Sequence, residues 1–161
     1  MTAAVIWSAV AGGFLGTLAL TTIVRAASEF GLTRMDLPLL LGTTVTENRR
    51  KARAIGYLIH FVVGPIFAVG YAALFIALGH HSWRMGALVG ALHAVFTGTA
   101  LVNVILPLLH PRIATTDTAA NDISLIEPPG FLMLNYGRNT FLVSLLAHIA
   151  FGAIVGWAVR F

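Results

Sequence analysis

Four long stretches without an ionised side chain constrain what this chain can fold into. They cover residues 3–24, 54–78, 85–109 and 141–159, and none of them contains Asp, Glu, Lys or Arg. A transmembrane helix needs about 20 mainly apolar residues, so each stretch has a suitable length. Only 10% of the residues are charged, whereas a soluble domain usually has about 25%. The sequence therefore predicts an all-α, polytopic integral membrane protein in which four transmembrane helices form one bundle over residues 1–161.

Other interpretations of these stretches fit less well. A membrane β-barrel would show segments of about ten alternating residues, which the sequence lacks. The first stretch exceeds the apolar core of a signal peptide, about 7–15 residues, and no basic residue precedes it, so we expect a retained helix. The net charge of +4 does not indicate a nucleic-acid partner, because most basic residues lie at the predicted membrane boundaries.

The basic residues also predict the orientation. Four crossings place both termini and the short loop 79–84 on one side, and the long loops 25–53 and 110–140 on the other. Loops rich in Lys and Arg stay in the cytoplasm. Eight of the ten such residues lie in the long loops: Arg25, Arg34, Arg49, Arg50, Lys51, Arg53, Arg112 and Arg138. We therefore expect cytoplasmic long loops and periplasmic termini.

Local motifs predict some order in the long loops. Thr44 and Glu47 fit a capping box, which would start the second long helix before the membrane. Its first turns would then lie beside anionic lipid headgroups and carry Arg49, Arg50, Lys51 and Arg53. In the other loop, the sequence Glu127-Pro128-Pro129-Gly130 excludes a helix and predicts a stiff, extended turn.

Small residues recur four positions apart in three of the stretches. Such pairs let helix backbones approach closely. They therefore predict contact faces, either within the bundle or toward another membrane subunit or a second copy of the chain. The pairs are Gly12/Gly16, Gly86/Gly90 and Gly152/Gly156. A weak repeat, in which a histidine is followed four residues later by a glycine at 60/64 and 148/152, also suggests two duplicated helix hairpins.

Several loop motifs point to a family. They are Leu32-Thr33-Arg34-Met35-Asp36-Leu37-Pro38 with Leu41-Gly42-Thr43, His110-Pro111-Arg112, and Glu127-Pro128-Pro129-Gly130-Phe131-Leu132 with Leu134-Asn135-Tyr136-Gly137. In these motifs the chain resembles a family of small, uncharacterised bacterial membrane proteins with four helices. The resemblance covers nearly the whole chain. It implies the bacterial inner membrane and supports the topology, but it assigns no activity and no functional residue.

Polar side chains inside the predicted helices mark a candidate site. With a helical rise of about 1.5 Å per residue, four of these residues lie about 8–12 Å from the helix ends that join the long loops, namely His60, His148, Asn103 and Thr21. His93 lies nearer the middle of its helix. Polar groups at such depth normally face the bundle interior. The sequence therefore predicts a ligand site formed by His60, His148, Asn103 and Thr21.

These residues could bind a metal ion or a haem, or they could only join neighbouring helices. A metal ion could be held by His60 and His148 with loop residues His110, Asp36 and Glu127, or a haem could take the two intramembrane histidines as axial ligands. No closely spaced pair of metal-ligating residues on one helix face supports a metal. Each histidine could instead join neighbouring helices by hydrogen bonds.

The sequence names no reaction. It contains no nucleophile elbow, phosphate loop or dinucleotide fingerprint, so we assign no catalytic residue. The resulting prediction is a non-enzymatic membrane protein, in contact with lipid, that has a possible metal or cofactor site on the cytoplasmic side. Two alternatives are a structural subunit of a larger membrane complex and a small channel or carrier formed by oligomerisation.

Overall fold

The computed structural model describes residues 1–114 and 126–161, and its regular structure is helical. Within these residues it contains no named strand. The elements are α1 (Ala3–Glu29), α2 (Leu37–Gly42), α3 (Arg49–Leu78), α4 (Trp83–Phe96), the π-helix η1 (Thr97–Ile105), α5 (Leu106–Leu109), the 3₁₀ segment η2 (Phe131–Tyr136) and α6 (Thr140–Ala158).

Four helical segments are long and apolar enough to cross a membrane, namely Ala3–Glu29, Arg49–Leu78, Trp83–Leu109 and Thr140–Ala158. This finding confirms the predicted all-α fold with four candidate transmembrane helices. The first two segments extend beyond the predicted stretches, to Glu29 and from Arg49. The reason is physical: a helix can continue into water with charged residues, whereas the sequence pattern marks only its apolar part.

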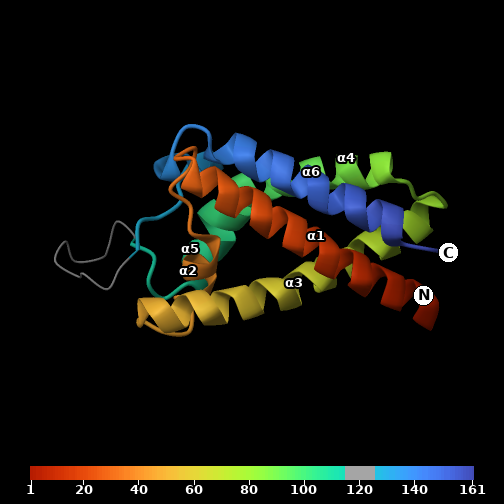
Figure 1. Cartoon of the computed structure of the whole chain (residues 1–161), viewed down its shortest axis with the longest axis horizontal. Coiled ribbons are helices and arrows are strands. Elements are labelled where there is room, and N and C mark those ends of the chain that lie inside the picture. Colours follow the sequence, from red (N-terminus) through yellow and green to blue (C-terminus); the bar gives the residue numbers. More distant parts are fainter. Residues whose placement is uncertain (115–125) are drawn as a thin grey trace.

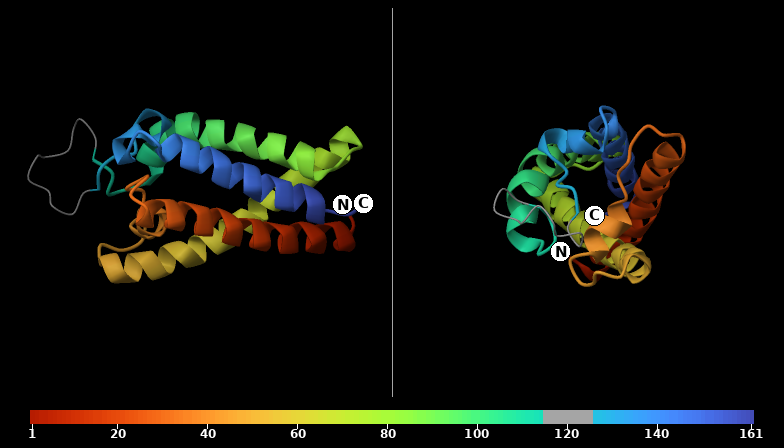
Figure 2. Two further views of the ribbon diagram at one scale, coloured as in Figure 1. Left: turned by 45° about the horizontal axis from the view of Figure 1, so that its top comes forward. Right: turned by 90° about the vertical axis from the view of Figure 1, so that its left-hand side faces the viewer.

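The long helices pack as two hairpins. α1 packs against α3, α4 packs against α6, and the contact between α1 and α6 joins the two pairs. Both termini lie at one end of the bundle (Figure 1), and we call the opposite end, which carries α2 and η2, the loop end. Figure 2 shows α3, in yellow, crossing α1 and diverging from the other helices toward the loop end. Whether the two hairpins arose by duplication stays a prediction.

Glycines form the closest helix contacts. A Cβ on Gly86 or Gly90 would overlap the backbone of α6, and a Cβ on Gly152 would overlap the backbone of α4. Gly156 lies against the backbone at Ser82 and Gly86, while Gly12 and Gly16 lie against α6 at Ala158 and Phe151. All three predicted glycine pairs therefore lie at contacts within the bundle.

The first long loop folds back onto α3. Asp36 caps α2 by accepting a hydrogen bond from the amide of Leu39 (3.0 Å), and its carboxylate also pairs with Arg53 (2.8 Å). Gly42 and Gly56 bring α2 onto α3, since a Cβ at either would overlap the backbone of the other helix. Arg53, predicted to face lipid headgroups, thus forms an ion pair within the chain. The other three residues of that set, Arg49, Arg50 and Lys51, are exposed.

The predicted capping box is wrong. The N-cap of α3 is Asn48, whose side chain accepts from the amide of Lys51 at 3.1 Å. The hydroxyl of Thr44 instead donates to the carbonyl of Leu41 at the end of α2, and Glu47 pairs with Arg112 at 3.4 Å. The sequence pattern did not reveal the short helix α2. This helix ends just before Thr44, and one of its carbonyls accepts the hydrogen bond of the Thr44 hydroxyl.

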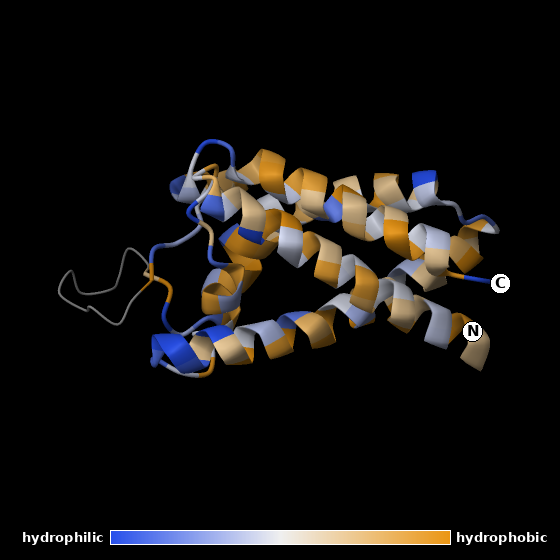
Figure 3. Cartoon of the chain, viewed as in Figure 1, coloured by the Kyte–Doolittle hydropathy of each residue, from blue (hydrophilic) through white to orange (hydrophobic). Residues whose placement is uncertain are grey.

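The two long loops interlock at the loop end. The amide of Arg34 donates to the carbonyl of Tyr136 (2.7 Å), and the guanidinium of Arg34 pairs with Glu127 (3.3 Å). The hydroxyls of Thr33 and Thr140 share a buried 2.7 Å hydrogen bond. As predicted, the backbone from Glu127 to Gly130 is not helical. Figure 3 shows hydrophilic residues concentrated at this end of the bundle, with a few more at the start of α4 and at the C-terminus.

Candidate functional site

A cavity of about 260 Å³ lies among the long helices on the side of the loop end. Its walls come from α1, α3, α4, η1 and α6, and most of them are apolar. Leu37, Leu40 and Leu41 of α2 line it together with Met133 of η2. The right-hand view of Figure 2 shows how these helices are arranged when the bundle is viewed from the loop end. The cavity exists because α3 diverges from the bundle while α2 packs against its diverging half.

Three of the chain's six histidines line this cavity, one from each of three helices: His60 from α3, His93 from α4 and His148 from α6. The rings of His93 and His148 lie edge to face, with centroids 4.9 Å apart. The predicted pair His60 and His148 therefore does face one interior space. The sequence predicts a lesser role for His93, because it lies nearer the middle of its helix, yet the ring of this residue is the neighbour of the His148 ring.

Each of the two neighbouring rings is held by a partner on one nitrogen. Nδ1 of His148 lies 2.8 Å from the carbonyl oxygen of Ser144, one turn earlier in α6. Nδ1 of His93 lies 3.0 Å from the hydroxyl of Tyr71 in α3, and the ring of Phe67 lies 4.4 Å from the His93 ring. These contacts hold the two rings in place, and the contact between Tyr71 and His93 ties α3 to α4.

Two buried polar atoms in the cavity wall have no hydrogen-bond partner among the described residues. They are Nε2 of His60 and Oγ1 of Thr97. Thr97 begins the π-helix η1, and Leu101 and Val102 of the same segment also line the cavity. π-helical turns inside α-helices are frequent at functional sites, and buried polar groups without partners are rare in folded proteins. Both features mark this wall as the candidate binding surface.

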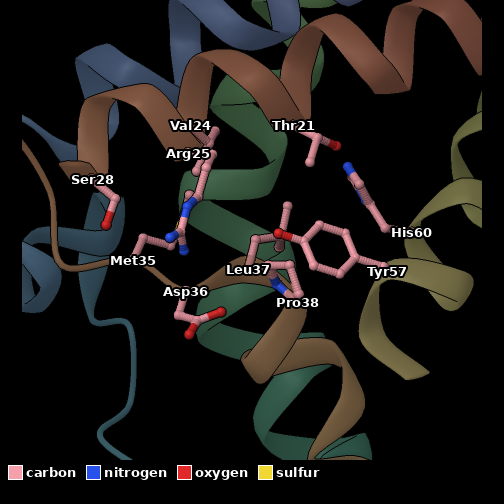
Figure 4. Close-up of a pocket in the computed structure, with 10 residues that line it drawn as sticks. All are labelled: Thr21, Val24, Arg25, Ser28, Met35, Asp36, Leu37, Pro38, Tyr57 and His60. Atoms are coloured by element: carbon pink, nitrogen blue, oxygen red, sulfur yellow. The ribbon is translucent and has the colours of Figure 1, made fainter. Parts of the chain in front are cut away.

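His60 also lines a second, smaller cavity of about 50 Å³ toward the loop end. Thr21 and Tyr57 line this cavity, as do the charged residues Arg25 and Asp36. Figure 4 shows the Thr21 hydroxyl and the His60 ring directed toward one another. The two cavities share Val24, Met35, Leu37 and His60. His60 thus stands between a polar chamber and the apolar one.

Asn103, predicted to belong to the site, lines neither cavity. Its side-chain amide donates to the carbonyls of Gly98 (3.0 Å) and Thr99 (2.7 Å) in its own helix, and the residue is exposed. The prediction assumed a regular α-helix through residue 103. In the π-helix, hydrogen bonds run from residue i to i+5, so each turn holds more residues and Asn103 faces outward.

The loop residues predicted as metal ligands are engaged elsewhere. Asp36 pairs with Arg53, and Glu127 pairs with Arg34. His110 is 3% exposed and accepts from the amide of Arg112 at 3.1 Å through Nδ1, while its Nε2 donates to the carbonyl of Leu40 at 2.9 Å. Among the described residues, no three His, Asp or Glu side chains converge as metal ligands would. The five-residue metal set is therefore not assembled.

Electrostatics at the loop end follow from burial. Burial lowers the pKa of His110, and the neighbouring Arg112 guanidinium acts in the same direction, against the hydrogen bond to Leu40. Burial and the nearby Glu127 carboxylate raise the pKa of Tyr136 to about 12. Tyr136 therefore keeps its proton and donates to the carbonyl of Glu127 at 2.7 Å.

Sequence reasoning missed Thr97, Tyr71 and the importance of His93. A local signal for two of them exists: a hydroxyl residue and a histidine lie four positions apart in α4–η1 (His93 and Thr97) and again in α6 (Ser144 and His148). Residues at this spacing share a helix face. Comparison of the chain with protein-family models, curated proteins and solved structures gives no match.

Proposed function

We propose that the chain is a membrane protein that binds a small, mainly apolar molecule in the cavity lined by the three histidines. Small-molecule sites are concave and mostly apolar, with a few placed polar groups that fix the orientation of the ligand. The cavity of about 260 Å³ has this character, with imidazoles and hydroxyls set in apolar walls. No reaction is assigned to it.

The observation that carries the proposal is the pair of unpartnered polar atoms in the cavity wall, Nε2 of His60 and Oγ1 of Thr97. A buried polar group without a partner costs about 1–3 kcal/mol. The hydrocarbon around a membrane-spanning bundle offers no hydrogen bond to offset that cost. A bound molecule with a hydrogen-bonding group would satisfy these atoms once the His60 ring and the Thr97 hydroxyl turn toward the cavity, while its apolar body fills the rest of the space.

Hydrogen bonding is favoured over metal binding because the described residues bring together no group of three His, Asp or Glu side chains that could hold a metal ion. The Nδ1 atoms of His93 and His148 are already engaged with Tyr71 and Ser144. The rings of these two residues meet edge to face at 4.9 Å, and no third His, Asp or Glu among the described residues joins them as a metal ligand would. The proposed ligand is therefore an organic molecule held by hydrogen bonds.

The proposal is tested by native mass spectrometry of the protein purified in lipid nanodiscs. We expect the wild type to retain a small organic adduct. The double variant His60→Phe/Thr97→Val should lose it, because it removes both unpartnered atoms. The matched control is His80→Phe/Thr99→Val, since His80 lies in the exposed turn after α3 and Thr99 is a half-buried residue of η1 that does not line the cavity. An adduct absent from the wild type, or retained by both double variants, contradicts the proposal.

The setting of the site is part of the proposal. We place the loop end in the cytoplasm of a bacterium and the bundle in its inner membrane. The resemblance in the loop motifs and the excess of Lys and Arg in the long loops support this placement. The exposed basic residues Arg49, Arg50 and Lys51 at the start of α3 would then contact anionic lipid headgroups. A place in a larger complex, or a channel formed by several copies, remains the alternative if no ligand binds.

A further inference from the structure

We infer that the molecule bound in the histidine-lined cavity donates a hydrogen bond to Nε2 of His148, so that it is a hydroxyl-bearing apolar compound such as a phenol or an alcohol. This inference rests on the proposed function and names the chemical class of its ligand. It follows from the hydrogen bonds that the His148 ring already makes.

The backbone fixes which nitrogen of His148 carries the proton. Nδ1 lies 2.8 Å from the carbonyl oxygen of Ser144. A carbonyl oxygen can only accept, so Nδ1 is the donor and carries the hydrogen. The Ser144 hydroxyl lies farther away, at 3.3 Å, and does not change this assignment. In the neutral ring the proton is then absent from Nε2, which presents a lone pair.

The surroundings favour the neutral ring. An imidazolium inside the hydrocarbon region would need an anionic partner, and no carboxylate is among the residues that line the cavity. Nε2 of His148 makes no hydrogen bond with the described residues. The atom is therefore an acceptor that a ligand must approach with an O–H or N–H group.

The His93 ring does not decide whether the ligand must donate or accept a hydrogen bond. The Tyr71 hydroxyl lies 3.0 Å from Nδ1 of His93 and 3.4 Å from the carbonyl of Val89, so it can donate to either one. Nε2 of His60 has no hydrogen-bond partner in the part of the chain that the structure describes, so it can serve as a donor or an acceptor. A hydroxyl group suits this mixed wall because it donates one hydrogen bond and accepts others. A ketone or an ether of similar size cannot donate to His148.

The volume limits the size of the ligand. An engineered apolar cavity of about 150 Å³ in another protein accommodates benzene, and this cavity measures about 260 Å³. It therefore has room for one ring with a short alkyl chain. A para-alkylphenol meets both the size and the hydrogen-bonding requirement.

Two isomers test the inference with the protein in nanodiscs. Para-butylphenol and para-propylanisole contain the same atoms, but only the phenol has an O–H donor. At equal concentration in the lipid, we expect the phenol to bind the wild type about five- to tenfold more tightly, as one hydrogen bond of about 1–1.4 kcal/mol implies. The preference should disappear in His148→Phe, which keeps an aromatic ring but removes the acceptor, and persist in His80→Phe.

The outcomes separate this inference from the proposed function. Equal binding of the two isomers to the wild type, or a phenol preference that survives in His148→Phe, would overturn the donor requirement and leave the ligand site standing. Binding of neither isomer would also overturn the inference, whereas the ligand site itself is contradicted only if the wild type retains no small organic adduct or both double variants retain it. A measurement that needs no variant is nitrogen NMR of ring-labelled histidine in the ligand-free protein. The Nδ1–H tautomer is expected for His148, and the Nε2–H tautomer would refute the inference.

Discussion

At the scale of single residues, His110 is more constrained than any intramembrane histidine. Both of its nitrogens are used in one neutral tautomer, with Nε2 donating to Leu40 and Nδ1 accepting from Arg112. A second proton on Nδ1 would remove the acceptor and place a cation beside the Arg112 guanidinium. The guanidinium itself donates to the carbonyl of Thr43 at 2.7 Å. His110 and Arg112 thus hold the end of α2 to the end of α5.

This arrangement predicts a loss of stability in acid. Because the folded state lowers the pKa of His110 below its ordinary value of 6.5, the folded protein binds this proton less readily than the unfolded chain. The stability it contributes is present above pH 6.5 and declines as the pH falls below that value. We expect the melting temperature to fall between about pH 7.5 and pH 5, and to fall less in His110→Asn.

The comparison with His110→Asn isolates this residue, since the other histidines titrate in both proteins. An asparagine keeps a donor for the Leu40 carbonyl but has no proton to gain in this range. Equal pH profiles for the wild type and His110→Asn would show that the contacts of His110 do not depend on its charge.

At the scale of helices, the contact between α4 and α6 depends on residues without a side chain. Gly86 and Gly152 face each other so closely that a Cβ on either would overlap the backbone of the other helix. In hydrocarbon, helix association relies on such close packing, because burial of apolar surface from water no longer drives it. Gly70 offers a contrast within the chain, since a Cβ at this position would meet no atom within 4 Å.

We expect Gly152→Ala to destabilise the protein by about 1–3 kcal/mol through overpacking. The matched change Gly70→Ala should be neutral or stabilising by up to about 1 kcal/mol, because alanine restricts the unfolded chain without a new contact. Unfolding both variants by titration with a denaturing detergent measures the difference. Equal free energies of unfolding for the two variants would mean that α4 and α6 separate more easily than their geometry indicates.

The helices differ in how far the sequence could predict them. The long spans follow from apolar length alone, because a membrane of fixed thickness demands it. α2 has only six residues and depends on contacts with α3 across Gly42 and Gly56, which no local pattern reveals. The π-helix changes the direction in which Asn103 points, and this rotation accounts for the wrong site assignment of that residue. That His60 and His148 line one cavity could be anticipated, because depth along a helix is nearly linear in residue number.

At the scale of the whole molecule, both termini lie at one end of the bundle and the interlocked loops lie at the other (Figure 1). This placement of the termini and the long loops could be predicted, because an even number of membrane crossings returns the chain to the side on which it began. Which helices are neighbours did not follow from the sequence, because apolar stripes face lipid and protein alike. The divergence of α3, and with it the cavity, depends on tertiary contacts at Gly13, Gly64 and α2.

The charge distribution predicts the side of the membrane on which each end lies. We expect alkaline phosphatase fused to the C-terminus to be active and a fluorescent protein fused there to be dark, because the loop end carries most of the Lys and Arg residues and should stay in the cytoplasm. A fusion after Arg49, within the loop end, serves as the reverse control. Activity of alkaline phosphatase at that site and not at the C-terminus would invert the orientation.

The close fit between α4 and α6 also bears on how the chain is made. α4 emerges from the ribosome well before α6, since η1, α5 and the second long loop lie between them. At about 5–20 residues per second, the interval between the synthesis of Gly86 and Gly152 is on the order of 10 s. During that interval the glycine face of α4 is uncovered within the lipid or the insertion machinery. Any other membrane helix that contacts this face during the interval competes with α6 for it. The order of synthesis therefore allows newly inserted α4 to associate with a wrong helix until α6 has been made.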